Sequence, residues 1–461
     1  MTSDTKASRI ERRKEGKALR EKCPRSSQGE WRPRSSSQDI IQLLEESDAD
    51  RIAGLIPLKY QRMSVSPFTF FRGSAIIQAR DLATCNVSGI TVQACGDCHL
   101  ANFGGYASPE RRIIFDINDF DETYPGPWEW DIKRLGASLV LASRDCGFSS
   151  RQGDEAVHAA AAAYRERMSA SAEMDALDRW YAQLTIEELQ EYFRNDPDMS
   201  TRLSSKYKQA SSETAEKAVL KFATVKAGVP RINDNPPTIY HLESLTRDFE
   251  SQRDAFVARY EKTLSTDHRF LYQKYRYRDV VVKVVGVGSV GTRCYMSLLL
   301  FDNEDPLFLQ CKEARRSVLE PPRGKRRYEH QGRRVVEGQR LMQAASDIFL
   351  GWSNTKNHDY YVRQYRDMKV SAEIDTFKAS TLVGYATMCG WTLARAHAKT
   401  GDATRIAGYL GSTEQFDDAL AQYSKAYADQ AERDFKTFKA AIRSGRLSTK
   451  PAKTNDLKFV V

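Results

Sequence analysis

The stretch "VVVKVVGVGSVGTRCYMSLLLFDNEDPLFLQCKEA", residues 280–314, decides the class of fold. Its β-branched and aromatic residues form short runs that turn-forming residues interrupt, which is typical of strands. "TRCYMSLLLF" (292–301) predicts one strand, "DNEDP" (302–306) a turn, and "LFLQCKEA" (307–314) the next strand. We therefore expect a glycine-rich turn between strands, followed by a strand that carries Lys312.

The glycines of "GVGSVG" (286–291) have the spacing G-x-G-x-x-G, which dinucleotide-binding folds also use. In those folds a helix follows the glycines directly, whereas here the pattern predicts a strand. A glycine-rich strand–turn–strand with a Lys on the next strand is the layout with which protein kinases hold nucleotide phosphates. We therefore expect this region to bind ATP through Gly286, Gly288, Ser289, Gly291 and Lys312.

A kinase-like lysine needs an acidic partner that fixes its position. The helix predicted for "RRVVEGQRLMQAASD" (333–347) supplies Glu337, and we expect it to pair with Lys312. Glu320 and Glu329 are also near in sequence and remain alternatives for this partner.

Helical periodicity dominates most of the remaining chain, and long helical patterns fill 151–262. The sequence predicts an α+β protein with a large helical lobe and a smaller strand-rich lobe. We expect four parts: a basic N-terminal helical segment (1–50), a helical lobe with the catalytic loop (51–276), a strand-rich nucleotide-binding lobe (277–370), and C-terminal helices that complete the helical lobe (371–461).

The motif "CGDCHLANFGG" (95–105) carries the candidate chemistry. Asp97 and Asn102 have the spacing D-x-x-x-x-N, in which kinases use the Asp to accept a hydroxyl proton and the Asn to hold a metal ion. A carboxylate suits proton acceptance, and Mg²⁺ prefers hard oxygen ligands. We expect His99 to belong to this catalytic loop as a hydrogen-bonding brace, because no second His has the spacing of a zinc site.

A second metal ligand is expected at the end of the strand predicted for "RRIIFDINDFDE" (111–122). Side chains alternate along a strand, so Asp116 points away from the side that Asp119 and Asp121 share. We choose Asp119 as the metal ligand because a Phe follows it. Asp116 and Asp121 remain open as additional ligands.

Two longer segments, "GDCHLANFG" and "FDINDFDETYPGPWEWDIKRLGAS", resemble an uncharacterised, mainly bacterial family, domain of unknown function 2252. "SPFTFFRGSA", "YYVRQYRDMK" and "LARAHAKTGD" resemble it too. The local pattern is also similar to aminoglycoside phosphotransferases and choline kinases, which carry GD-x-H-x-x-N, then I-D-[FWY], then a structural Asp about a dozen residues later. This resemblance implies that Asp119 binds the metal and that Asp131, 12 positions further on, braces the loop.

The order of these segments differs from that of a kinase. The glycine loop, Lys312, Glu337, a hinge strand at 360–369 and a helix at 384–402 all follow the catalytic loop in sequence, although in kinases they precede it. We therefore expect a two-lobed, protein-kinase-like fold in circularly permuted order.

These features predict an ATP- and Mg²⁺-dependent phosphotransferase that acts on a small hydroxyl- or amine-bearing substrate. Arg62 and Arg72 are candidates for the acceptor side or for structural ion pairs. An inactive nucleotide-binding regulator is an alternative, which the intact acidic motif disfavours. A metal-dependent phosphoesterase is another, and it would leave the glycine loop and Lys312 unexplained.

Composition limits the partners. The net charge of +9 invites a nucleic-acid interaction, but 70 Lys and Arg are spread among 61 acids and no basic stripe with interleaved aromatics stands out. We expect no nucleic-acid partner. The apolar runs are too short for a membrane span, no apolar segment follows the start, and the eight cysteines are scattered, so we expect a cytoplasmic protein with reduced thiols and no membrane partner.

Overall fold

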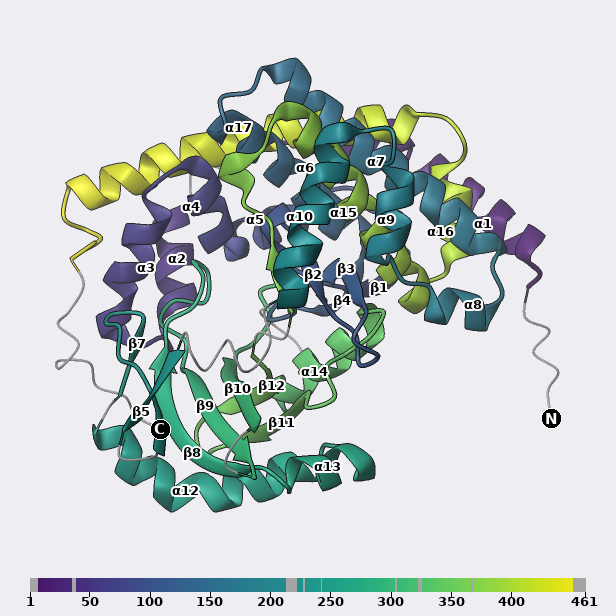
Figure 1. Cartoon of the computed structure of the whole chain (residues 1–461). Coiled ribbons are helices and arrows are strands. Elements are labelled where there is room, and N and C mark those ends of the chain that lie inside the picture. The colour runs from purple at the N-terminus through teal and green to yellow at the C-terminus, as the bar shows by residue number, and fades with distance from the viewer. Residues whose placement is uncertain are drawn as a thin grey trace.

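The computed structural model describes residues 7–34, 39–212, 222–226, 229–241, 243–302, 305–321, 326–365 and 368–450. The protein is α+β, as the sequence predicted. Figure 1 shows a body of helices above a strongly twisted sheet, with two small sheets between them. No helix among the described residues is both long enough and apolar enough to span a lipid bilayer.

The body is built from long helices whose small buried residues allow close contact. Its main members are α6 (Trp128–Asp145), α7 (Ser150–Glu173), α15 (Ala379–Thr400), α16 (Ala403–Leu410) and α17 (Gln415–Arg443). Helices α15 and α7 pack along much of their length. At one crossing, a Cβ added to Gly390 would lie 2.1 Å from the carbonyl oxygen of Ala160, so only glycine permits this approach.

The basic N-terminal segment forms α1 (Arg9–Lys22), which lies against α16. Arg20 donates hydrogen bonds from α1 to the carbonyl oxygens of Tyr409 and Gly408. The other helices of the first half are α2 (Ile40–Asp48), α3 (Ile56–Met63), α4 (Pro67–Gly73), α5 (Ala75–Leu82), α8 (Ala176–Tyr181), α9 (Ile186–Tyr192) and α10 (Pro197–Ser212).

The large sheet has six antiparallel strands in the order β11-β12-β10-β9-β8-β7. They are β7 (Ile239–Tyr240), β8 (Arg276–Lys283), β9 (Cys294–Phe301), β10 (Asp305–Ala314), β11 (Gly351–Asn354) and β12 (Asp359–Gln364). Three helices accompany the sheet: α12 (Glu243–Glu261), α13 (Thr266–Tyr272) and α14 (Gln331–Met342). Helix α12 contacts β11, and α14 contacts β10, β11 and β12.

The sheet extends further back along the chain than the strand-rich region expected at 277–370. Strand β7 pairs with β8 through Ile239 and Tyr240, and a separate hairpin of β5 (Ala223–Lys226) and β6 (Val229–Ile232) precedes it. The helical pattern expected over 151–262 is therefore interrupted by strands.

Two small sheets lie between the large sheet and the helical body (Figure 1). One pairs β1 (Thr91–Ala94) with β4 (Tyr124–Pro127), and the other has the order β13-β2-β3. In the second, β2 (Phe103–Ala107) forms a hairpin with β3 (Ile113–Ile117), and β13 (Val370–Ser371) pairs with the outer edge of β2. The loop at 95–102 connects β1 to β2, so both small sheets position it.

Candidate active site

The loop at 95–102 is held from behind by Asp131, near the start of α6. The Asp131 carboxylate accepts hydrogen bonds from the backbone N–H groups of Cys95 (2.6 Å) and Gly96 (2.9 Å). His397 of α15 places its Nε2 atom 3.1 Å from the same carboxylate. Asp131 is 1% exposed and lines no cavity with Asp97, so its place is that of a brace.

Asp97 lies on the cavity side of the loop. Arg134, one turn after Asp131 on α6, donates from its Nε to Asp97 Oδ1 at 2.5 Å. Burial raises the pKa of Asp97, although the positive charge of Arg134 opposes this effect. Because Arg134 occupies Oδ1, the second oxygen, Oδ2, is the one left to accept a proton.

Asn102 is oriented by the same loop. Its side-chain NH₂ group donates to the backbone carbonyl of Asp97 at 2.8 Å. The side-chain oxygen accepts no hydrogen bond from the described residues, so it can serve as a ligand atom.

His99 is not the hydrogen-bonding brace that its position suggested. Its Nε2 lies 3.7 Å from Asp97 Oδ2, too far for a hydrogen bond, and its Nδ1 has no partner among the described residues. Burial and the charges of Arg72 and Arg134 hold the pKa of His99 well below its usual range, so the ring is neutral near pH 7. The contact that closes the loop comes instead from the backbone N–H of His99, which donates to Asp97 O at 2.8 Å.

The acids in and after β3 point in two directions, although the strand ends at Ile117 and so strand alternation does not extend to Asp119 and Asp121. Asp116 is fully buried and pairs with Arg395 of α15 at 2.7 Å. Asp119 and Asp121 face the large sheet, where both meet the ammonium group of Lys312. Asp116 is therefore a structural residue and is not available to a metal ion.

Lys312, on β10, is 2% exposed and forms its ion pairs with Asp121 and, at 3.8 Å, with Asp119. Burial opposes its charge, but these two carboxylates outweigh burial and raise the pKa of Lys312. Burial raises the pKa of Asp119, and the neighbouring charge of Asp121 adds to the rise. For Asp121, burial is outweighed by Lys312 and by a 2.8 Å hydrogen bond from Tyr361, so its pKa is lowered.

The predicted pairing of Glu337 with Lys312 is wrong. Glu337 accepts a hydrogen bond from Arg333, one turn earlier on α14, at 2.6 Å, and its side chain is 37% exposed. The helix turns other positions inward, including Arg334, which donates to the carbonyl oxygens of Asp121 and Thr123. Asp121 takes the place expected of Glu337.

The glycine loop at 286–291 connects β8 to β9, and no helix begins there. Gly286 and Gly291 have positive φ values of 61° and 90°, which side chains rarely adopt. Helix α3 holds the start of the loop, because Arg62 donates to Gly286 O at 2.6 Å. Ser289 reaches the acids and donates to Asp121 Oδ2 at 3.3 Å.

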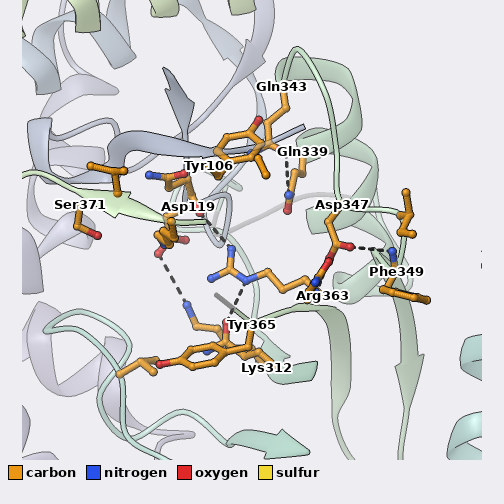
Figure 2. A pocket seen from close by; sticks show the side chains of 18 of the residues that line it. Tyr106, Asp119, Lys312, Gln339, Gln343, Asp347, Phe349, Arg363, Tyr365 and Ser371 are labelled. Carbon is orange, nitrogen blue, oxygen red and sulfur yellow. Dashed lines mark hydrogen bonds and ion pairs between the residues drawn. The ribbon is translucent and has the colours of Figure 1, made fainter. Parts of the chain in front are cut away.

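Two cavities meet at these residues. The larger cavity, of about 920 Å³, lies between the large sheet and the small sheets. Figure 2 shows it from close by: Lys312 faces Asp119, and Arg363 of β12 lies beside this pair. The smaller, of about 360 Å³, is lined by Asp97, His99 and Asn102. Both are lined by Arg72, Asp119, Gly286 and Ser289.

These cavities bring together nearly all of the sequence-predicted site residues, and Glu337 lines neither. Asn102 and Asp119 line the same small cavity, which suits a cation that takes few protein ligands. The described residues contain no group of three or more His, Cys, Asp or Glu side chains that could hold a metal ion.

Arg134 and Arg363, which lie close to the acids of the site, were not predicted from the sequence. Arg134 could have been found from its position three residues after Asp131, which places both on the same face of α6. Arg363 lies in the quoted segment 360–369, on the strand next to Lys312, and its Nε donates to Gln310 at 2.9 Å. No sequence signal distinguishes Arg363 from Arg366, the other arginine in that segment.

A family described as "Uncharacterized protein conserved in bacteria (DUF2252)" matches residues 51–441 of the chain. No curated protein matches the sequence, and no solved structure matches the fold.

Proposed function

We propose that this chain, which belongs to the DUF2252 family of uncharacterised bacterial proteins, is an ATP- and Mg²⁺-dependent phosphotransferase with a protein-kinase-like, circularly permuted fold. The observation that carries the proposal is the meeting of the two cavities at Asp119. Lys312 lines one cavity, Asp97 and Asn102 line the other, and the glycine loop lines both through Gly286 and Ser289.

The larger cavity has the two kinds of surface that a nucleotide needs. Lys312 and Arg363 supply positive charge beside the glycine loop, where phosphates would bind. The lining further away is apolar and would take the base; it includes Leu271, Tyr275, Leu307, Ile348 and Phe349. This division favours ATP as the phosphoryl donor.

The smaller cavity places a proton acceptor beside the donor site. Asp97 Oδ2 accepts the proton of the acceptor's hydroxyl or amine while that oxygen or nitrogen forms a bond to the γ-phosphorus. The bond between the γ-phosphorus and the β–γ bridging oxygen breaks, and ADP leaves with that electron pair. Catalysis of this kind depends mainly on position and charge.

The oxygens of Asn102 and Asp119 would hold the metal ion. Bound there, Mg²⁺ neutralises charge on the transferred phosphoryl group. The positive charge of Lys312 favours the ionised form of Asp119, although burial and Asp121 raise the pKa of Asp119, and Asp97 O fixes the amide of Asn102. Two protein ligands suffice because Mg²⁺ takes its other ligands from water and from substrate phosphates.

The permuted order is supported by the packing of α15 behind the loop at 95–102. Tyr385 of α15 donates to the carbonyl oxygens of Leu100 and Phe103, and His397 contacts Asp131. This helix follows the large sheet in sequence, yet it lies where the helix before a kinase catalytic loop would lie.

Thermal unfolding with Mg-ATP tests the donor site. A ligand that binds only the native state stabilises it by about 2.7 kcal/mol at 100 times its Kd. We expect Mg-ATP to raise the melting temperature, Lys312→Met to reduce that shift, and the exposed control Lys436→Met to preserve it. An equal shift in Lys312→Met and wild type would remove Lys312 from the phosphate site.

Transfer is tested by incubating the protein with γ-labelled ATP and a metabolite extract, followed by mass spectrometry. A labelled product that depends on Asp97 supports the phosphotransferase. Binding of Mg-ATP without any labelled product or phosphate release would instead favour the nucleotide-binding regulator.

A further inference from the structure

We propose that the smaller cavity binds an acceptor that carries a negatively charged group, a phosphate or a carboxylate, in addition to its reacting hydroxyl. The inference rests on the proposed function for the reacting group and on three arginines for the anion. Arg72, Arg80 and Arg315 line the cavity from α4, from α5 and from the end of β10.

These three arginines are largely uncommitted. Within the described part of the chain, Arg72 has no ion pair, and its Nε is buried without a hydrogen-bond partner. Its guanidinium group lies 5.7 Å from the ring of Phe68, which orients it without neutralising it. Arg315 also has a buried Nε without a partner, and its nearest carboxylate, on the exposed Asp50, is 3.9 Å away.

Arg80 completes the set. Its side chain is half-buried, and it lies one turn after Ile76 on the face of α5 that lines the cavity. Among the residues that the structure describes, it makes no hydrogen bond or ion pair. Arg80 lines only the smaller cavity, whereas Arg72 also lines the larger one.

The carboxylates around the same cavity are mostly occupied, so they do not offset these arginines. Asp97 is engaged by Arg134, and Asp121 by Lys312. The remaining buried acids also have partners: Glu313 pairs with Arg293, Glu320 with Arg316, and Glu122 accepts from the backbone N–H of Val318. Among the described residues, Arg72, Arg80 and Arg315 therefore have no close ion pair with the buried carboxylates of this cavity.

The arginines without a close ion pair favour an acceptor that carries an anionic group. A cationic amine would require free carboxylates. Glu46 and Asp50 are exposed at the rim, Asp119 lies 3.8 Å from Lys312, and Glu122 already accepts from the backbone N–H of Val318. Guanidinium groups bind phosphate and carboxylate through paired N–H donors and remain charged at any working pH. A volume of about 360 Å³ suits a small metabolite rather than a peptide or a nucleic acid.

Calorimetry with small matched probes tests the inference. Glycerol 3-phosphate, glycerate, glycerol and ethanolamine share a small hydroxyl-bearing skeleton and differ in charge. Each is titrated into protein saturated with magnesium and a non-hydrolysable ATP analogue, so that the donor site is closed to anions. We expect the two anionic probes to bind and the neutral and cationic probes to bind at least about tenfold more weakly. The ranking of phosphate against carboxylate identifies which anion the arginines select.

In the variant Arg80→Met the affinity for the anionic probes should fall by about tenfold or more. The variant Arg80→Lys should recover part of that affinity. The exposed Arg443→Met on α17 is the matched control and should bind like the wild type. Tighter binding of ethanolamine than of either anion, or unchanged anion affinity in Arg80→Met, would overturn the inference. The same titrations without nucleotide distinguish the anion site from the phosphotransferase. If the anionic probes bind through Arg80 but Mg-ATP does not bind, the phosphotransferase is contradicted and the anion site is not.

Discussion

At the scale of single residues, the two acids of the site are held in different ways. Asp97 is fixed by Arg134 on the cavity wall with Asn102, whereas Asp119 faces Lys312 across the larger cavity. Substituting each Asp by Asn therefore distinguishes an effect on proton transfer from an effect on the binding of Mg-ATP.

Asp97→Asn should lower turnover by about 10²-fold or more, because an amide cannot accept the acceptor's proton. Affinity for Mg-ATP should stay close to that of the wild type. Asp119→Asn should weaken the affinity for Mg-ATP itself, since it removes a charged metal ligand. Calorimetry beside a turnover assay measures both effects, with the exposed Asp178→Asn as the control. Near-normal turnover of Asp97→Asn would show that Asp97 is not the base.

Residue spacing was enough to identify the residues of the loop but not those of the helix opposite. Asp97, Asn102 and Asp119 lie in short segments of fixed geometry, so their spacing predicted that they meet. Glu337 lies on α14, and the sequence did not show which face of that helix turns inward. Its neighbour Arg334 occupies the inner face, and Asp121 pairs with Lys312 instead.

At the scale of elements, the close crossing of α15 and α7 depends on one glycine. Gly390→Ala would place a methyl group 2.1 Å from Ala160 O, so the helices must separate. We expect the variant to lose about 1–3 kcal/mol of unfolding free energy, the usual cost of overpacking. Chemical denaturation measures the loss, and Thr387→Ala, half-buried on the same helix, should change stability much less.

The start of the large sheet has a pH-sensitive contact. His241, directly after β7, lies 3.1 Å from Asp279 and 2.8 Å from Asp234, and these two partners raise the pKa of His241. The folded state therefore holds this proton more tightly than the unfolded state does. Its stabilising contribution is complete below the ordinary histidine pKa of about 6.5 and is lost as the pH rises through the raised value.

Unfolding measured from pH 5.5 to pH 8.5 tests this contact. The wild type should lose stability relative to His241→Gln as the pH increases. A constant difference between the two proteins across this range would show that the ring does not titrate differently on folding.

The elements themselves were predicted unevenly. The strands around the glycine loop were found because their apolar runs are long and turn residues bound them. Strand β7 was missed because it has only two residues, Ile239 and Tyr240, and comes shortly after "NDNPP" (233–237), which indicates a loop. A strand this short exists through its pairing with β8, which sequence periodicity cannot show.

At the scale of the whole molecule, one buried ion pair joins segments that are far apart in sequence. Arg395 of α15 contacts Asp116 of β3 and donates to Met342 O at the end of α14. The positions of these segments in the sequence did not predict that they are in contact. The resemblance to kinases did predict that the helix at 384–402 lies beside the catalytic loop.

Arg395→Met should destabilise the protein by about 3–5 kcal/mol, because it leaves the Asp116 carboxylate buried without its counter-ion. Adding Asp116→Asn to this variant should recover part of the loss. A double-mutant cycle by denaturant unfolding measures the coupling. Additive losses in the two single variants would mean that the pair contributes no interaction energy.

The contact of Lys312 with two carboxylates also has a consequence for the order in which ligands can bind. Free Mg²⁺ would have to compete with the ammonium group for Asp119, and would leave the buried ammonium group with Asp121 as its one carboxylate partner among the described residues. Nucleotide phosphates would relieve this competition, because they would accept the ammonium group as the metal takes the carboxylate. The two ligands should therefore bind with positive cooperativity, each raising the affinity for the other by the same factor. In Lys312→Met the cooperativity should fall while the affinity for free Mg²⁺ rises, and titrations of metal and nucleotide, separately and together, would measure both changes.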